Sequence, residues 1–187
     1  MGRAPTFQQL PEVLRRLPRA EASADALRAF EIRLVYGLLQ TEAYARVLLC
    51  NDDAVRERMQ RQRILTKPNP PTVFVVLDES VLLREVGSRE IMREQLEHLI
   101  EMSERENITI QIAPIGYYRD ARAPFVIATQ PDRSEIVYLE SNIGGETSAE
   151  PRDLALVSEA FSRLQAAALS SKASVELMRK VVEERWT

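Results

Sequence analysis

The sequence predicts an α/β protein of the mixed α+β kind, with a small mixed sheet covered by helices. Three observations indicate this: a continuous apolar run at 72–77, an alternating run at 108–112, and an amphipathic helical segment between them. A strand, a helical crossover of about 30 residues and a second strand make a βαβ unit, whose strands we expect to be parallel with a right-handed crossover. A later pair of strands predicts an antiparallel hairpin.

Length and composition favour one domain. The chain has 187 residues, and 45% of them are hydrophobic, which is enough for a sizeable core. We expect an N-terminal arm at 1–20 and a single α/β domain at 21–187. Lys and Arg number 25 against 28 Asp and Glu, so the formal net charge of −3 indicates no general affinity for nucleic acids or membranes.

The N-terminal third is predicted to be helical. Prolines punctuate residues 1–20, which leaves room only for a short helical turn at 13–17. Residues 22–34 are predicted to form a helix, because Ser23 can cap it and apolar residues recur on one face. Two further helices are expected, at 41–50 with Thr41 as N-cap and at about 52–64, the second burying Val55 and Met59.

The remainder alternates between strands and helices. A Pro-rich loop at 67–71 precedes the strand at 72–77, which is followed by a helical turn at 81–86 and a helix capped by Ser88. Strands are predicted at 108–112, 125–129 and 135–139, and a turn at 142–145 leads to a short edge strand. Two helices complete the chain, one starting at Pro151 and one at 173–185.

Several common catalytic and cofactor signatures are missing from the sequence. His98 is the only histidine and Cys50 the only cysteine, so neither a usual zinc site nor a Ser-His-Asp triad can be assembled. No Walker or GxGxxG loop occurs. We therefore expect no metal and no cofactor. The single cysteine fits a reducing compartment, and with neither an apolar leader nor an apolar span we expect a cytoplasmic protein that does not enter the membrane.

Polar side chains gather where the two parallel strands are predicted to end. Asp78 and Glu79 follow the first of these strands, and Tyr117 and Tyr118 follow the second. Ligands of open α/β sheets bind at this edge, so these groups and Arg84 could form a polar pocket capable of acid–base work. The alternative is structural: Asp78 caps the following turn and Glu79 pairs with Arg84.

Two features of the predicted helices are interpreted as structural or docking features rather than as sites of chemistry. The helix at 52–64 and the loop after it carry five basic residues, which we interpret as a solvated or partner-docking face, since aromatic side chains for base stacking are missing: Arg56, Arg58, Arg61, Arg63 and Lys67. Gln95 lies within an apolar helical stripe, and we expect its amide to bond to backbone at a helix–helix contact. Direct nucleic-acid binding is not expected.

One segment carries a family resemblance. Leu34–Arg46, LVYGLLQTEAYAR, resembles the PGLLQT-x-x-YAR signature of domain of unknown function 5753, the effector or partner-binding part of actinobacterial Xre-type, antitoxin-like helix-turn-helix regulators. The similarity extends over about residues 25–170 through an ordered set of shorter matches: Arg61–Arg63, Asp78-Glu79, Leu83-Arg84, Met92, Gln95-Leu96, Leu99, Ile110–Pro114, Pro124-Phe125 and Val137–Glu140.

Two departures from that family bear on function. Only some 20 residues precede the matching region, too few for a helix-turn-helix, so the sequence is either a piece of a longer chain or a protein without direct DNA binding. Tyr36 stands where the family usually has proline, and its ring and hydroxyl could line a pocket.

Two functions are consistent with these features. The resemblance implies a regulatory domain that binds a small molecule, a small protein partner or a second copy of itself as a homodimer, and candidate binding residues are Tyr36, Gln40, Tyr44, Arg84, Tyr117 and Tyr118. The alternative is a cofactor-free acid–base enzyme of specialised metabolism, an isomerase, cyclase, lyase or hydrolase. Its candidate groups are Asp78 or Glu79 as base, Tyr36 or Tyr138 as acid, Arg84 as anion holder, and Glu140. A closed pocket joining Tyr36, Asp78 and Glu140 would favour the enzyme, and a flat apolar patch would favour a protein partner.

Overall fold

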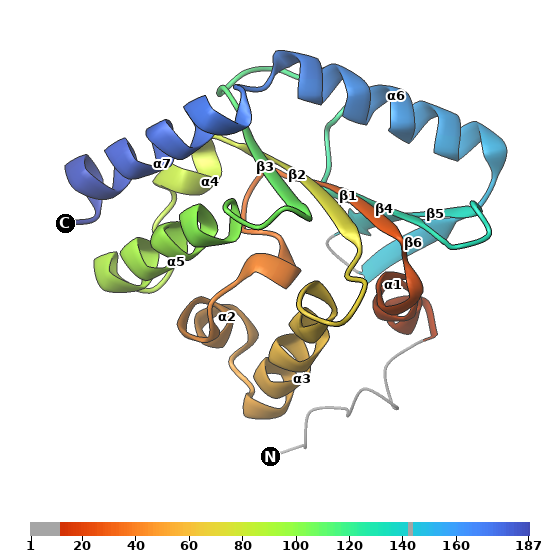
Figure 1. Ribbon diagram of the computed structural model, residues 1–187, viewed down its shortest axis with the longest axis horizontal. Coiled ribbons are helices and arrows are strands. Elements are labelled where there is room, and N and C mark those ends of the chain that lie inside the picture. The colour runs from red at the N-terminus through yellow and green to blue at the C-terminus, as the bar shows by residue number, and fades with distance from the viewer. Residues whose placement is uncertain (1–11, 142–143) are drawn as a thin grey trace.

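A six-stranded mixed sheet forms the centre of the computed structural model, which describes residues 12–141 and 144–187 (Figure 1). The strand order is β3-β2-β1-β4-β5-β6, with bounds β1 Ala26–Glu31, β2 Thr72–Asp78, β3 Ile108–Ala113, β4 Phe125–Thr129, β5 Glu135–Ser141 and β6 Gly144–Ser148. The helical elements are α1 Glu12–Ser23, η2 Gly37–Leu39, α2 Glu42–Leu49, α3 Asp52–Gln62, η3 Arg63–Leu65, α4 Ser80–Leu83, α5 Arg89–Met102, α6 Pro151–Ala167 and α7 Ser171–Arg185.

Strand β1 divides the sheet into a parallel and an antiparallel half. β1 and β2 are parallel, as are β2 and β3, whereas β4 is antiparallel to β1 and the β4-β5-β6 series is antiparallel throughout. The mixed fold class is thereby confirmed, together with the parallel β2–β3 pair, the β4–β5 hairpin and the short edge strand β6. Within the described residues, no helix combines the length and apolar character needed to cross a bilayer.

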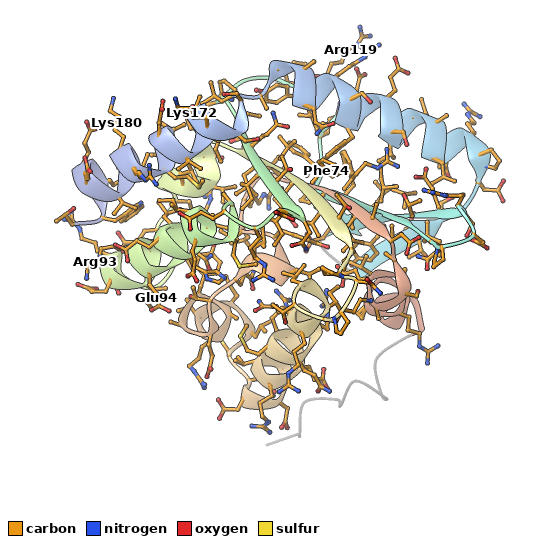
Figure 2. All side chains as sticks on the ribbon, in the orientation of Figure 1. Phe74, Arg93, Glu94, Arg119, Lys172 and Lys180 are labelled. Carbon is orange, nitrogen blue, oxygen red and sulfur yellow. The ribbon has the colours of Figure 1, made fainter. Side chains whose placement is uncertain are left out.

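Helices cover both faces of the sheet and create two apolar clusters. α6 covers one face, where Phe125 packs between Phe30 and Phe161 with ring centroids 5.7 and 6.3 Å apart. Phe74 of β2 lies on this same side (Figure 2). α1, η2, α2, α3, α5 and α7 cover the other face or its edge (Figure 1), and here the larger cluster forms. The site described below lies on this second face.

The helix predicted at 22–34 is wrong, because its central residues form strand β1 instead. Leu27 and Ala29 face the larger cluster while Phe30 faces α6, so the strand is buried on both sides. Burial of both faces removes the polar–apolar alternation that marks a strand, and the remaining apolar spacing happens to fit a helix. Ser23, expected to begin this helix, is the last residue of α1.

The other helices lie close to their predicted positions. Thr41 caps α2 by accepting a hydrogen bond from the Tyr44 backbone N–H at 3.2 Å, and Ser88 likewise caps α5. Val55 is buried as expected, but Met59 is only partly buried. The turn expected at 81–86 is α4, which starts one residue earlier and is shorter. In the expected arm, residues 12–20 belong to α1, a longer helix than the predicted turn, while residues 1–11 and 142–143 lie outside the described residues.

Gln95 of α5 holds the junction between η2 and α2. Its side chain is fully buried, its Nε2 donates to the Leu39 carbonyl at 2.8 Å, and its Oε1 accepts from the Thr41 backbone N–H at 2.8 Å. The predicted bonding of this amide to backbone is confirmed. Through these two bonds, α5 positions the segment that carries Tyr36 and Gln40.

Substituting Gln95 by leucine is expected to destabilise the protein by about 2 kcal/mol, because one buried donor and one buried acceptor lose their partner. Urea unfolding followed by circular dichroism measures this change. The matched control is Gln60→Leu on the exposed side of α3, which should change stability by less than about 0.5 kcal/mol. Equal effects of the two substitutions would contradict the structural role given to Gln95.

Candidate functional site

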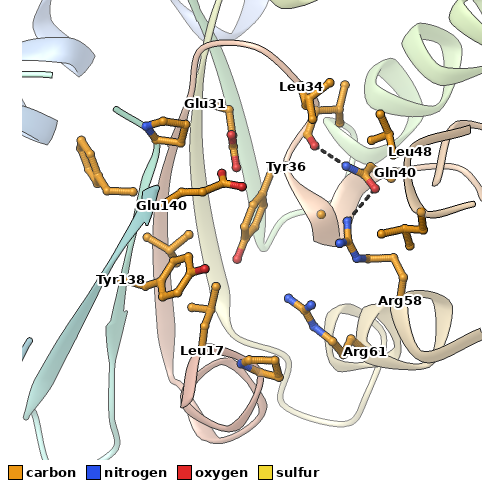
Figure 3. A pocket seen from close by; sticks show the side chains of 17 residues that line it. Leu17, Glu31, Leu34, Tyr36, Gln40, Leu48, Arg58, Arg61, Tyr138 and Glu140 are labelled. Carbon is orange, nitrogen blue, oxygen red and sulfur yellow. Dashed lines mark hydrogen bonds between the residues drawn. The ribbon is translucent and has the colours of Figure 1, made fainter. Parts of the chain in front are cut away.

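A cavity of about 360 Å³ opens on the larger-cluster face of the sheet (Figure 3). The ends of β1, β4 and β5 form its floor, α1 and α3 flank it, and the segment through η2 closes one side. Its volume lies within the range of about 300–1,000 Å³ that is typical of small-molecule sites. The polar side chains that line it come from four separate parts of the chain: Glu31, Tyr36, Gln40, Arg58, Arg61, Tyr138 and Glu140.

Two carboxyl groups face each other across Pro124. Phe30 of β1 and Leu139 of β5 both pair with Phe125, so the next residues, Glu31 and Glu140, flank Pro124 on the same face of the sheet. The Glu140 backbone N–H donates to the Pro124 carbonyl at 3.2 Å, which extends the register by one step. The two side chains point toward one another (Figure 3). Glu31 is partly buried, whereas Glu140 is exposed at the rim.

Glu31 has an unusual proton affinity. Burial, followed by the negative charge of Glu140, raises the pKa of Glu31 from 4.5 to about 8, and the positive charge of Arg58 offsets only part of this increase. At neutral pH the Glu31 carboxyl is therefore largely protonated. A carboxylic acid in this state can donate a hydrogen bond or release a proton to a ligand.

Two guanidinium groups from α3 form the opposite side of the cavity (Figure 3). Arg58 donates from Nη1 to Gln40 Oε1 at 2.6 Å, and Gln40 in turn donates from Nε2 to the Val35 carbonyl at 2.7 Å. Burial, and then the charge of Arg61, lowers the pKa of Arg58. Gly37 makes room for this guanidinium, since a Cβ at that position would lie 2.8 Å from Arg58 Nη1.

Arg61 belongs to a buried ionic triad. Its Nη2 donates to Glu21 Oε2 at 2.5 Å, and the Tyr36 hydroxyl donates to Glu21 Oε1 at 2.7 Å. Glu21 is 1% exposed and Tyr36 2% exposed, so this carboxylate depends on these two donors. Burial and then the charge of Glu21 raise the pKa of Tyr36 well above its ordinary value. Arg61 Nε is buried and, among the described residues, has no hydrogen-bond partner.

Tyr138 completes the site beside Glu140. Its pKa is raised by burial first and by the charge of Glu140 second, so its hydroxyl remains a proton donor near neutrality. The edge strand leaves space for the ring at Gly145, where a Cβ would lie 2.0 Å from the Tyr138 ring. Any larger residue at 145 would displace the tyrosine from the cavity wall.

Comparison with known families places the whole site in one matched region. A family model described as a domain of unknown function, DUF5753, matches residues 14–180. The chain belongs to the DUF5753 family. No curated protein matches it. All the cavity side chains described above lie within the stretch that carries the family match.

The DUF5753 chain brings together four of the site residues expected from sequence. Tyr36, Gln40, Tyr138 and Glu140 all line the cavity. Tyr44 is fully buried and does not line the cavity. Its hydroxyl accepts a hydrogen bond from the Val35 backbone N–H at 3.3 Å.

The other expected residues lie apart from this cavity. Asp78 accepts from the Ser80 backbone N–H at 2.9 Å, which fits the capping alternative, and Glu79 accepts from the Ile115 backbone N–H at 3.3 Å. Burial, followed by the charges of Asp78 and Glu79, raises the pKa of Tyr118, whose hydroxyl donates to the Pro114 carbonyl at 2.5 Å. Arg84 and Tyr117 are exposed. None of the residues expected in a strand-end pocket lines the cavity of the DUF5753 chain, and a closed pocket joining Tyr36, Asp78 and Glu140 is not found among the described residues.

Sequence reasoning missed three side chains of the DUF5753 cavity, Glu31, Arg58 and Arg61. Glu31 was hidden by the helix wrongly assigned to β1. Arg58 and Arg61 were interpreted as part of a solvated or docking face, yet their i, i+3 spacing places them on one side of α3, and that side turns toward the sheet. Among the described residues, no group of three or more His, Cys, Asp or Glu side chains is arranged to hold a metal ion.

Proposed function

We propose that this DUF5753 chain is a sensing domain that binds a small polar molecule in the cavity between β1, β5 and α3. The observation that carries the proposal is the convergence of ionisable groups from four parts of the chain on one cavity of about 360 Å³. Structural ion pairs alone do not require such a space. A pocket with a few convergent polar groups and perturbed pKa values is the usual form of a binding site.

A small molecule fits this surface better than a protein partner does. Among the described residues, the exposed large hydrophobic side chains are spread over α2, the loop after β3 and α6: Val47, Ile115, Tyr117 and Leu156. Protein interfaces usually present a contiguous apolar patch, and these positions do not supply one. The cavity therefore has the stronger claim to function.

The cavity also offers a route by which binding could change the rest of the domain. The bond from Arg61 to Glu21 joins α3 to α1, and Tyr36 joins the η2 segment to the same carboxylate. A ligand that moved Arg61 would therefore alter how α1 is held. We extend the proposal to the regulators that this sequence resembles, the actinobacterial Xre-type proteins, in which the DNA-reading part precedes this domain.

Thermal unfolding in the presence of a library of small polar metabolites tests the proposal. A ligand that binds only the folded state stabilises it by about 2.7 kcal/mol at a concentration 100 times its Kd. We expect a stabilising compound whose effect disappears in Leu34→Trp, which fills the cavity, and persists in Leu156→Trp on the outer side of α6. The proposal fails if no compound stabilises the protein, or if the effect survives in Leu34→Trp.

A second candidate function, cofactor-free acid–base catalysis, is favoured by one observation. The pKa of Glu31 is raised to about 8, which is the range in which a carboxyl group can both give and take a proton near neutrality. Mass spectrometry and proton NMR of the stabilising compound after incubation separate the two functions. Catalysis predicts a changed compound, or solvent deuterium in it, and loss of that change in Glu31→Gln. A sensing domain returns the compound unaltered.

A further inference from the structure

Acidic groups line one side of the cavity and basic groups line the other. Glu31 and Glu140 extend from the sheet on one side, and Arg58 and Arg61 extend from α3 on the other (Figure 3). Neither pair satisfies the other, because Arg58 bonds to the Gln40 amide and Arg61 to Glu21, outside the carboxyl pair. The acidic and basic groups therefore stay on opposite sides of the cavity without a direct bond between them.

The arginine side retains hydrogen-bonding capacity. A guanidinium has five N–H donors, and the contacts to Gln40 and Glu21 use one nitrogen of each arginine. The Nε of Arg61 is buried and has no partner among the described residues. Because this Nε has no accessible surface, an anionic group in the cavity would meet the Nη nitrogens of the two arginines instead.

We infer that the cavity binds a small zwitterion, with its ammonium group between Glu31 and Glu140 and its carboxylate or other anionic group at Arg58 and Arg61. This inference rests on the proposed function and names its ligand class. A molecule with one charge would satisfy only one side of the cavity. A neutral molecule would bring no opposite charge to Glu140 or to Arg58.

Binding of the ammonium group has a consequence for protons. Glu31 holds a proton at neutral pH, and a cation placed against the carboxyl pair stabilises its ionised form, so binding releases that proton to solvent. The titratable or charged groups that interact with Glu31 come from β5, α3, the η2 segment and α2: Glu140, Tyr138, Arg58, Tyr36 and Tyr44. Glu21 of α1 and Arg61 of α3 act in turn on Tyr36 and Tyr138. Both tyrosines nearest the carboxyl pair have raised pKa values and stay neutral in this range.

Isothermal titration with three probes of equal chain length tests the ligand class: 6-aminohexanoate, hexylamine and hexanoate. We expect 6-aminohexanoate to bind at least about tenfold more tightly than either singly charged probe. Titration in phosphate and in Tris buffer should then give different apparent enthalpies for 6-aminohexanoate below about pH 8, because these buffers take up the released proton with different heats.

Three variants assign the two ends of the ligand, and two more serve as controls. Glu31→Gln should abolish the buffer dependence and reduce the affinity for 6-aminohexanoate to that for hexanoate, whereas Arg58→Met should reduce it to that for hexylamine. Glu159→Gln and Arg56→Met, both exposed and outside the cavity, should bind like the wild type. Glu140→Gln on the exposed rim repeats the test of the ammonium end in case Glu31→Gln fails to fold.

The outcomes separate this inference from the function on which it rests. Equal binding of hexanoate and 6-aminohexanoate, or unchanged affinity in Glu31→Gln, overturns the zwitterion while the sensing function stands. The same holds if none of the three probes binds but another library compound stabilises the protein in a way that Leu34→Trp abolishes. Failure of both the probes and the library overturns both proposals.

Discussion

Replacing Arg61 with methionine is expected to destabilise the fold by about 3 kcal/mol, because it leaves a buried carboxylate without its counter-charge. Glu21 is 1% exposed, and its remaining partner would be the Tyr36 hydroxyl at 2.7 Å. Methionine preserves most of the length and apolar contact of the arginine stem, so the lost charge dominates the effect. Urea unfolding monitored by tryptophan fluorescence and circular dichroism gives the free-energy change.

The double variant Glu21→Gln/Arg61→Met separates the charge effect from packing. It should recover part of the loss, because a neutral amide at position 21 no longer needs a cation, and the coupling energy from the double-mutant cycle should exceed about 1 kcal/mol. Arg56→Met is the control on the exposed side of α3, where Arg56 forms an ion pair with Asp53. If Arg61→Met cost no more than Arg56→Met, the buried triad would not hold α1 and α3 together as described.

Replacing Glu31 with glutamine is expected to stabilise the protein at neutral and alkaline pH and to leave it nearly unchanged in acid. The folded-state pKa of Glu31 is about 8 and its ordinary value is 4.5, so the folded state binds the proton more tightly than the unfolded chain does. The stability linked to this proton is complete below about pH 4.5 and is lost as the pH rises through about 8. At about 1.4 kcal/mol per unit of pKa shift, the loss reaches roughly 3 kcal/mol near neutrality.

Thermal unfolding measured from about pH 5 to about pH 9 checks this sign and size. The wild-type stability should fall relative to that of Glu31→Gln across this interval, since the amide carries no proton to lose. Glu159→Gln, exposed on α6, should follow the wild-type curve throughout. Parallel curves for Glu31→Gln and the wild type would show that this carboxyl group titrates like an ordinary surface glutamate.

Sequence patterns predicted those elements whose local signals agree with their tertiary environment. Thr41, Ser88 and Pro151 mark helix starts through capping and N1 preferences, which depend on the nearest residues alone. The alternation at 108–112 identified β3 because one face of that strand meets a different environment from the other. β1 could not be identified in this way, since apolar clusters bury both of its faces.

The site was predictable only in part for a related reason. Tyr36 and Gln40 came from the family resemblance, and Glu140 from its place at the end of a predicted strand. Their neighbours in space could not be found without the sheet order, because β5 lies next to β4 and one strand away from β1. Once β1 was read as a helix, the opposition of Glu31 and Glu140 across Pro124 had no basis in the sequence.

The central position of β1 also governs how the chain must reach its native state. Ala26 pairs with Thr72 on one side and with Thr129 on the other, so the strand made first waits for segments made much later. Non-local pairing of this kind raises contact order and slows folding. During synthesis on the ribosome, β2 can pair with one edge of β1 early, but the other edge and the face that α6 covers stay exposed until β4 and α6 have emerged, and the cavity could form only near the end of translation. An N-terminal fragment that lacks β4 is therefore not expected to fold rapidly. Early binding of β1 by a chaperone is the expected protection against aggregation.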